Sequence, residues 1–180
     1  MQYPKFEEVV KFHGHSCPGL AMGYKLTLAA LEKLNKLRAE DEEIVAIVEN
    51  DACGTDAVQF ISGCTFGKGN FIFKDHGKMV YTFICRKSGR AIRASRNPDF
   101  LNRVKKEESS REELINQILE SKSEDFANLE EISIELPPEA KLYKNIVCEE
   151  CGETAMETRI RKRDGRKLCI PCAENIKKYI

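Results

Sequence analysis

Two histidines and a cysteine fall within five residues near the start of the chain, and their types and spacing suit metal binding or thiol chemistry. The stretch reads Phe12-His13-Gly14-His15-Ser16-Cys17-Pro18-Gly19. A neutral imidazole nitrogen and a thiolate sulfur are both ligands for metals such as zinc. Pro18 favours the first turn of a helix, so Cys17 is predicted at or beside the helix N-cap, where the helix dipole favours the thiolate. We predict the rim of a metal or catalytic site here.

Two further turns carry cysteine together with charged residues and glycine. The first spans residues 49–56 and contains Cys53, and the second spans residues 63–70 and contains Cys64. Turns at the ends of helices and strands are where functional residues gather. If the three turns converge, they form one pocket. The predicted ligands of this core metal site are His13, His15, Cys17, Cys53 and Cys64.

Charged residues in the same turns suggest catalytic roles. Asp51 or Asp56 would orient a ligand histidine or act as a base, and Lys68 would neutralise an anionic group. An incomplete protein coordination sphere would leave a place for water or substrate. The candidate catalytic residues are Cys17, His15, Asp51 and Lys68.

An alternative uses the thiols without a metal. Cys17 would be a low-pKa nucleophile in a protein that handles thiols or sulfur, and Cys53 or Cys64 would be its resolving partner. A single cysteine is more often a small buried hydrophobe, and on that ground Cys85, inside a strand pattern, is assigned to the core. His76, in a predicted hairpin turn, is expected to be exposed.

Four cysteines near the C-terminus have the spacing of a zinc site. Cys148 and Cys151 form one C-x2-C pair, and 17 residues later Cys169 and Cys172 form a second. Each pair offers adjacent vertices of a tetrahedron, so the spacing predicts a structural four-thiolate zinc site. The order of knuckle, hairpin and helix-borne cysteines resembles a treble-clef zinc finger of the DksA/TraR type. Forty residues bury little core, so the metal is expected to fold them.

Basic residues cluster on the predicted hairpin of this finger. A third interpretation is therefore a non-enzymatic binding module that docks a partner subunit or nucleic acid, with nucleic acid ranked last. These residues are Arg159, Arg161, Lys162, Arg163, Arg166 and Lys167.

Composition separates the chain into two parts. The 180 residues include 29 basic and 29 acidic side chains, so net charge gives no general attraction to nucleic acid or membrane. Residues 1–140 hold 19 basic and 23 acidic side chains, whereas residues 141–180 hold 10 and 6. No signal peptide and no membrane-spanning run is found, so a cytoplasmic protein is expected. In that compartment the eight cysteines are predicted to be ligands or reactive thiols, not disulfides.

Hydrophobic periodicity predicts the elements that position these residues. A helix is expected over 18–37 and a buried strand over 44–48, followed by a helix from about residue 55. A hairpin is expected from strands at 70–74 and 79–86. A capping box at Ser110–Glu113 begins a later helix, a last strand is expected near 131–136, and Pro137-Pro138 indicates a boundary.

Three stretches resemble the FmdE family of proteins linked to formylmethanofuran dehydrogenase. They are residues 12–20, the run Asp51-Ala52-Cys53-Gly54-Thr55-Asp56-Ala57-Val58-Gln59, and the run Gly63-Cys64-Thr65-Phe66-Gly67-Lys68-Gly69-Asn70. The resemblance implies an α+β core with an antiparallel sheet flanked by helices over residues 1–140, and a treble-clef finger over 141–180. It also implies a homodimer and association with a molybdenum- or tungsten-dependent formylmethanofuran dehydrogenase in methanogenesis or other anaerobic one-carbon metabolism. The chain has no motif for a molybdopterin or an iron–sulfur cluster, so we do not expect it to oxidise formylmethanofuran alone.

Overall fold

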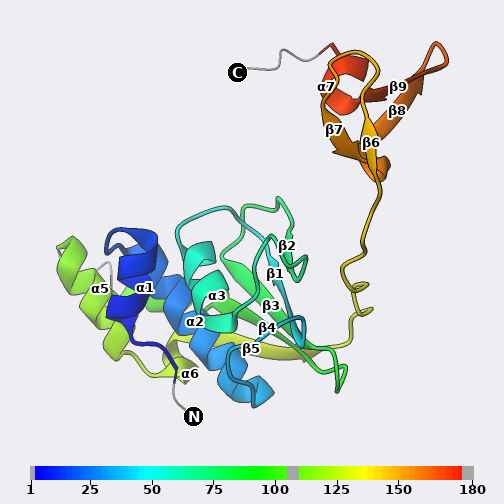
Figure 1. Cartoon of the computed structure of the whole chain (residues 1–180). Coiled ribbons are helices and arrows are strands. Elements are labelled where there is room, and N and C mark those ends of the chain that lie inside the picture. The colour runs from blue at the N-terminus through cyan, green and yellow to red at the C-terminus, as the bar shows by residue number, and fades with distance from the viewer. Residues whose placement is uncertain (1–2, 105–109, 176–180) are drawn as a thin grey trace. The chain divides into compact units, whose positions relative to one another are not determined.

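A five-stranded sheet with the strand order β2-β1-β3-β4-β5 forms the centre of the N-terminal unit. In a computed structural model that describes residues 3–104 and 110–175, this unit ends at Ala140 and a second compact unit begins at Lys141 (Figure 1). The last five residues of the predicted finger domain lie outside the described residues. The five strands are β1 (Ile44–Val48), β2 (Phe71–Phe73), β3 (Val80–Cys85), β4 (Ala91–Arg96) and β5 (Ala127–Ile132).

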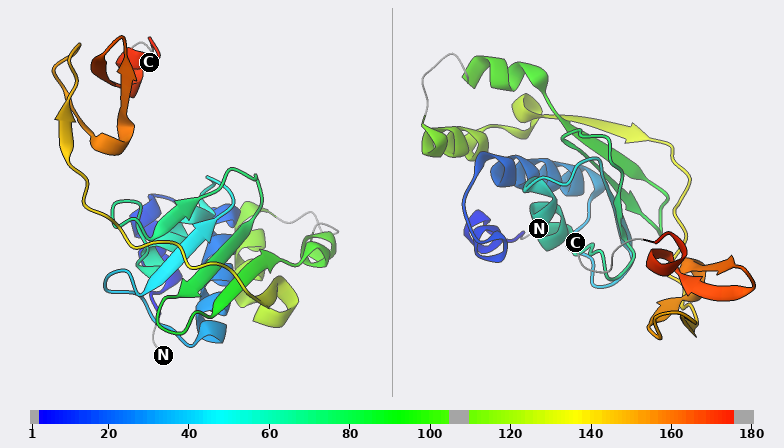
Figure 2. Two further views of the ribbon diagram at one scale, coloured as in Figure 1. Left: turned by 90° about the vertical axis from the view of Figure 1, so that its right-hand side faces the viewer. Right: turned by 90° about the horizontal axis from the view of Figure 1, so that it is seen from above.

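The helices of this unit pack mainly on one face of the sheet (Figure 2). Side chains alternate between the two faces along each strand. Ala46 and Val48 of β1 join the large core under the helices, whereas Val45 and Ile47 join a small apolar cluster on the opposite face. The helices are α1 (Phe6–His13), α2 (Pro18–Leu34), α3 (Gly54–Ser62), α4 (Pro98–Val104), α5 (Arg111–Glu120) and α6 (Ser123–Phe126).

The sheet is mixed, not entirely antiparallel as expected. β1 pairs antiparallel with β3 but parallel with β2, in a register that places Ile47 beside Ile72. The predicted hairpin between β2 and β3 is therefore wrong, because β1 lies between these two strands. A strand, a helix and a second strand in succession form a crossover unit with parallel strands, and β1-α3-β2 is such a unit. The α+β class itself is confirmed.

Several local predictions are confirmed with shifted ends. β1 has the predicted bounds, and α2 ends at Leu34, three residues earlier than expected. Ser110 caps α5, and the side chain of Glu113 accepts a hydrogen bond from the Ser110 backbone in return. The last strand of the sheet lies at 127–132, where it pairs with β4.

The second unit consists of two short hairpins and one helical turn. β6 pairs with β7, and β8 pairs with β9. Its elements are β6 (Asn145–Val147), β7 (Thr154–Met156), the 3-10 turn η1 (Glu157–Arg159), β8 (Ile160–Arg163), β9 (Arg166–Cys169) and α7 (Ile170–Ala173). Among the described residues, no helix is long and apolar enough to cross a membrane.

Candidate metal centres

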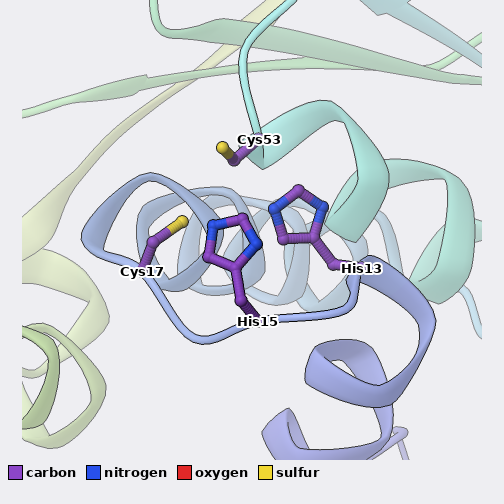
Figure 3. A group of neighbouring side chains, drawn as sticks. All are labelled: His13, His15, Cys17 and Cys53. Atoms are coloured by element: carbon purple, nitrogen blue, oxygen red, sulfur yellow. The ribbon is translucent and has the colours of Figure 1, made fainter.

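Two histidines and two cysteines meet at one point of the N-terminal unit (Figure 3). One ligand atom from each of His13, His15, Cys17 and Cys53 lies within 4.8 Å of the corresponding atom of every other member. His13 ends α1, His15 lies in the link to α2, and the two cysteines precede the first residues of α2 and α3. Two of the three predicted turns therefore converge. We call these four residues the core cluster.

The local sequence explains how the first three members are positioned. Gly14 ends α1 in the left-handed region, with φ of 95°, which glycine adopts without steric cost. Cys17 is the N-cap of α2, as predicted, and its Sγ accepts a hydrogen bond of 3.3 Å from the Leu20 N–H. Pro18 follows in the first turn. The link between the two helices is short, so the three ligand side chains remain close together.

Three glycines allow the N-terminal parts of α2 and α3 to approach closely. Gly19 and Gly23 lie four residues apart on α2 and face the start of α3, where Gly54 follows Cys53. A Cβ at Gly23 would overlap the backbone of Gly54, and a Cβ at Gly54 would overlap the hydroxyl of Tyr81. This close contact brings Cys53 to Cys17. The spacing of Gly19 and Gly23 is the signal in the sequence that could have indicated it.

Replacing Gly23 by Ala should therefore destabilise the N-terminal unit strongly. The new methyl group meets backbone atoms, which cannot rotate away, so we expect a loss of about 3 kcal/mol in the free energy of unfolding. Urea unfolding measures this loss. Gly67→Ala is the control, because a Cβ there meets nothing within 4 Å and should change stability by less than about 0.5 kcal/mol. Equal stability of the two variants would contradict the close helix contact.

A carboxylate orients one ligand of the core cluster. The Nδ1 of His13 lies 2.7 Å from Oδ2 of Asp56, and because the carboxylate can only accept, Nδ1 carries the proton. The other ring nitrogen, Nε2, then presents a lone pair. It is buried and has no hydrogen-bond partner among the described residues. A buried nitrogen without a partner, beside two thiols and a second imidazole, is what a metal ligand without its ion looks like.

Removing this carboxylate should weaken metal binding at the core cluster. In Asp56→Ala the His13 ring loses its fixed orientation, and we expect metal affinity to fall about 10- to 100-fold. Competition with a chromogenic chelator measures the affinity. Gln59→Ala is the control, since Gln59 touches only the other oxygen of Asp56, at 3.4 Å. An Asp56→Ala affinity equal to that of the control would rule out this role.

The donor set fits a zinc-type ion. Two sulfurs and two imidazole nitrogens suit tetrahedral zinc. Burial, and then the neighbouring Cys17 thiol, raise the pKa of Cys53, and a bound cation would offset both effects by favouring the thiolates. Four protein ligands are available here, whereas the sequence suggested an incomplete sphere. His15 is the exposed member of the set, so it is the ligand that exchanges most easily with solvent.

Cys64 belongs to the core of the fold and not to this cluster. Cys53 precedes α3 and Cys64 follows it, so a nine-residue helix of about 13 Å separates them. The thiol of Cys64 is fully buried and donates to the Ile44 carbonyl at 3.3 Å. Burial raises its pKa to about 11. The third predicted turn therefore supplies no ligand.

The two other predicted catalytic residues also lie outside the cluster. The ammonium group of Lys68 donates to the carbonyls of Glu40 and Asp41, at 3.3 and 3.1 Å, and so fixes its own loop. Asp51 is exposed and is not among the grouped ligands. Asp56 makes the contact with a ligand histidine that the sequence allowed for either aspartate.

The four C-terminal cysteines form the second cluster. One sulfur from each of Cys148, Cys151, Cys169 and Cys172 lies within 4.8 Å of the others. Gly152 donates its N–H to the Cys148 carbonyl at 2.9 Å, which closes the knuckle. Among the described residues of this unit, only Cys148, Leu168 and Cys169 are buried in its apolar cluster. So small a core fits a domain that is held together by its metal.

Hydrogen bonds prepare one of these thiols for ionisation. Backbone N–H groups of Cys151 and Cys169 lower the pKa of Cys148 to about 6, from an ordinary value of 9.0. Burial and the neighbouring sulfurs raise the pKa of Cys172 to about 12. Zinc requires all four thiolates, so the ion would supply the charge that ionises the others.

Acidification should release zinc from the finger in a defined pH range. The folded unit favours the Cys148 thiolate, so this group stabilises the fold above its ordinary pKa of 9.0, and the contribution is lost as the pH falls through about 6. Bound zinc holds the thiolates further, so we expect half-release at or below about pH 6. A zinc-responsive dye monitors the release. Half-release near pH 9 would contradict the expectation.

Comparison with known proteins places the chain in a family. The family described as "FmdE, Molybdenum formylmethanofuran dehydrogenase operon" matches residues 12–134. The chain therefore belongs to the FmdE family. Residues 141–177 match the prokaryotic dksA/traR C4-type zinc finger. Both matches confirm the resemblances seen in the sequence.

Two relatives extend this comparison. An Archaeoglobus fulgidus protein named "Probable S-adenosyl-L-methionine-binding protein" is 34% identical over 191 residues. The match covers 91% of this chain and 50% of that protein, so the chain spans about half the length of this relative. A crystal structure of an FmdE-like protein of tungsten formylmethanofuran dehydrogenase from Syntrophus aciditrophicus has a TM-score of 0.72, with 24% identity and full coverage of both chains. This second likeness supports the fold.

Proposed function

We propose that the core cluster binds a zinc-type metal ion and that the protein uses this centre as an accessory subunit or enzyme related to the molybdenum or tungsten formylmethanofuran dehydrogenases. The observation that carries the proposal is the buried Nε2 of His13, which has no partner in the described part of the chain and lies among three further ligand atoms. Family membership supports the metabolic assignment. A cytoplasmic homodimer that meets oxidoreductase partner subunits is part of the same proposal.

The residues divide the work at this centre. His13, His15, Cys17 and Cys53 would hold the ion, which supplies Lewis-acid chemistry when bound. Asp56 holds the His13 ring in the tautomer that presents Nε2. Because His15 is exposed, its place is where a substrate oxygen or sulfur could enter. The C-terminal finger would be structural, with zinc on its four cysteines.

A reconstitution experiment tests the accessory role. The zinc-loaded chain would be mixed with a purified tungsten formylmethanofuran dehydrogenase, and co-elution and formylmethanofuran oxidation would be measured. We expect co-elution and a higher rate, and we expect the His15→Ala/Cys17→Ser double variant to co-elute without the rate increase. Neither co-elution nor a change in rate with the wild-type chain would reject the accessory role.

The thiol-handling alternative keeps one supporting observation. The sulfurs of Cys17 and Cys53 lie within 4.8 Å of each other and neither is in a disulfide. A two-electron oxidant such as glutathione disulfide would join them, releasing two glutathione thiols. Faster alkylation of Cys17 than of a free thiol, with a reversible Cys17–Cys53 disulfide, would favour this alternative. Ordinary alkylation rates would remove it.

S-adenosylmethionine binding is not part of the proposal. It is the printed property of a relative of which this chain covers only 50%, and it could belong to the half that the match does not reach.

A further inference from the structure

One arginine on the inner face of the sheet has no ionic partner in the described structure. Arg96 is the last residue of β4 and shares its face with Ile92 and Ala94, which are fully buried in the core. Its Nε is buried and has no hydrogen-bond partner among the described residues. The contact of its Nη1 is with the thioether sulfur of Met22, at 3.7 Å. A thioether is a weak acceptor for a charged donor.

The other arginines around this sheet are engaged with carboxylates. Each of three has an ion pair: Arg86 with Glu42, Arg90 with Glu131, and Arg93 with Glu49. Among the described residues, no carboxylate lies within ion-pair distance of Arg96. A half-buried guanidinium with an unpartnered N–H costs free energy unless an anion completes it. The edge of the group that carries Nε suits the two oxygens of a carboxylate or phosphate.

Two paths of contact connect Arg96 to the core cluster. Met22 lies five residues after Cys17 on α2, about 7.5 Å along the helix axis, and helical side chains lean towards the N-terminus. On the other side, extending the register of β3 and β4 by one residue places Met79 beside Arg96. The sulfur of Met79 accepts the hydroxyl of Tyr81 at 3.0 Å. That hydroxyl lies against Gly54, next to the ligand Cys53.

The side chains that cover Arg96 can move at little cost. Met22 and Met79 are unbranched and flexible, and the sulfur contacts that they make are weak. Rotation of Met22 would uncover the guanidinium from the side of α2, on which Cys17 lies. An anionic group could then reach Arg96 while the rest of a small molecule extends towards the metal.

We propose that Arg96 is the anion anchor of the core metal site and binds the carboxylate or phosphate of a small molecule whose other end reaches the metal. This inference rests on the proposed metal centre and adds the class of its substrate. A span of about two helical turns between anchor and ligands, about 11 Å, limits the molecule to a short organic acid or phosphate ester. Arg96 acts as a binding and positioning residue.

Anion titration of the full-length zinc-loaded protein tests the anchor. Sodium acetate and inorganic phosphate would each replace chloride at constant ionic strength, with thermal unfolding and calorimetric binding as readouts. The variants are Arg96→Met and Arg96→Lys. Arg93→Met is the matched control, since Arg93 lies on the same strand, faces the other side of the sheet and is paired with Glu49.

We expect at least one anion to raise the Tm of the wild type and of Arg93→Met, because a ligand stabilises the state that binds it. Arg96→Met should lose this response, with binding at least about tenfold weaker, and Arg96→Lys should keep a reduced one. Without anion, Arg96→Met should unfold at or above the wild-type temperature, since an unpartnered donor is removed.

The outcomes distinguish the ligand and the two proposals. A response to acetate alone identifies a carboxylate, and a response to phosphate alone identifies a phosphate. No response of the wild type to either anion, or an equal response of Arg96→Met, overturns the anchor. Metal content is measured on the same samples, so an empty core cluster with a normal anion response would reject the metal centre and leave the anchor standing.

Discussion

The Cys148→Ser variant should lose the zinc of the C-terminal finger and with it the fold of residues 145–173. Structural zinc in such fingers contributes about 10–16 kcal/mol, far more than three buried residues can replace. Amide chemical shifts of the finger should collapse to unfolded values. Shifts of the N-terminal unit should remain, because that unit has its own core.

Val147→Ser is the matched control for this prediction. Val147 adjoins Cys148 on β6, and its side chain is 56% exposed, so its replacement removes no ligand and little packing. The control should keep its zinc and its dispersed spectrum. A folded finger in Cys148→Ser would show that hydrogen bonds and packing, and not the metal, hold this unit together.

The Cys17→Ser variant should lose the metal of the core cluster and a large part of the thermal stability of the N-terminal unit. A ligand that binds only the folded state adds about 4 kcal/mol when its free concentration is about 1,000 times its Kd. The hydroxyl of serine is a poor ligand for zinc, so the variant should lose most of this gain. Thermal unfolding with and without added zinc measures the difference.

Cys64→Ala separates metal binding from the loss of a thiol. Cys64 is fully buried but contacts the Ile44 carbonyl, not the core cluster. This variant should lose about 1 kcal/mol of stability and still respond to zinc. Loss of the zinc response in Cys64→Ala, or its retention in Cys17→Ser, would contradict the ligand set.

Much of the local structure was predictable, because it depends on neighbouring residues. The position of Pro18 indicated Cys17 as an N-cap, and the apolar run Ile44–Val48 indicated a buried strand. The pairing of β1 with β2 was missed, although a strand, helix and strand in succession is the pattern of a parallel crossover. Period and turn signals describe each element but not its neighbours in the sheet.

The candidate site was predictable in part for a similar reason. Two short C-x2-C pairs define their own geometry, so the second cluster followed from spacing alone. The core cluster joins residues from distant turns, and their convergence depends on how α2 packs on α3. The helix between Cys53 and Cys64 could have excluded Cys64 from the sequence. The orphan Nε2 of His13 could not have been foreseen, since it depends on the position of Asp56.

Elemental analysis of two full-length proteins tests the central claim most directly. The wild type and the Cys169→Ser/Cys172→Ser variant, which removes half of the finger ligands, would be purified with zinc present and analysed per chain. The core cluster predicts two metal ions in the wild type and one in the variant. One ion in the wild type and none in the variant would show that only the finger binds metal.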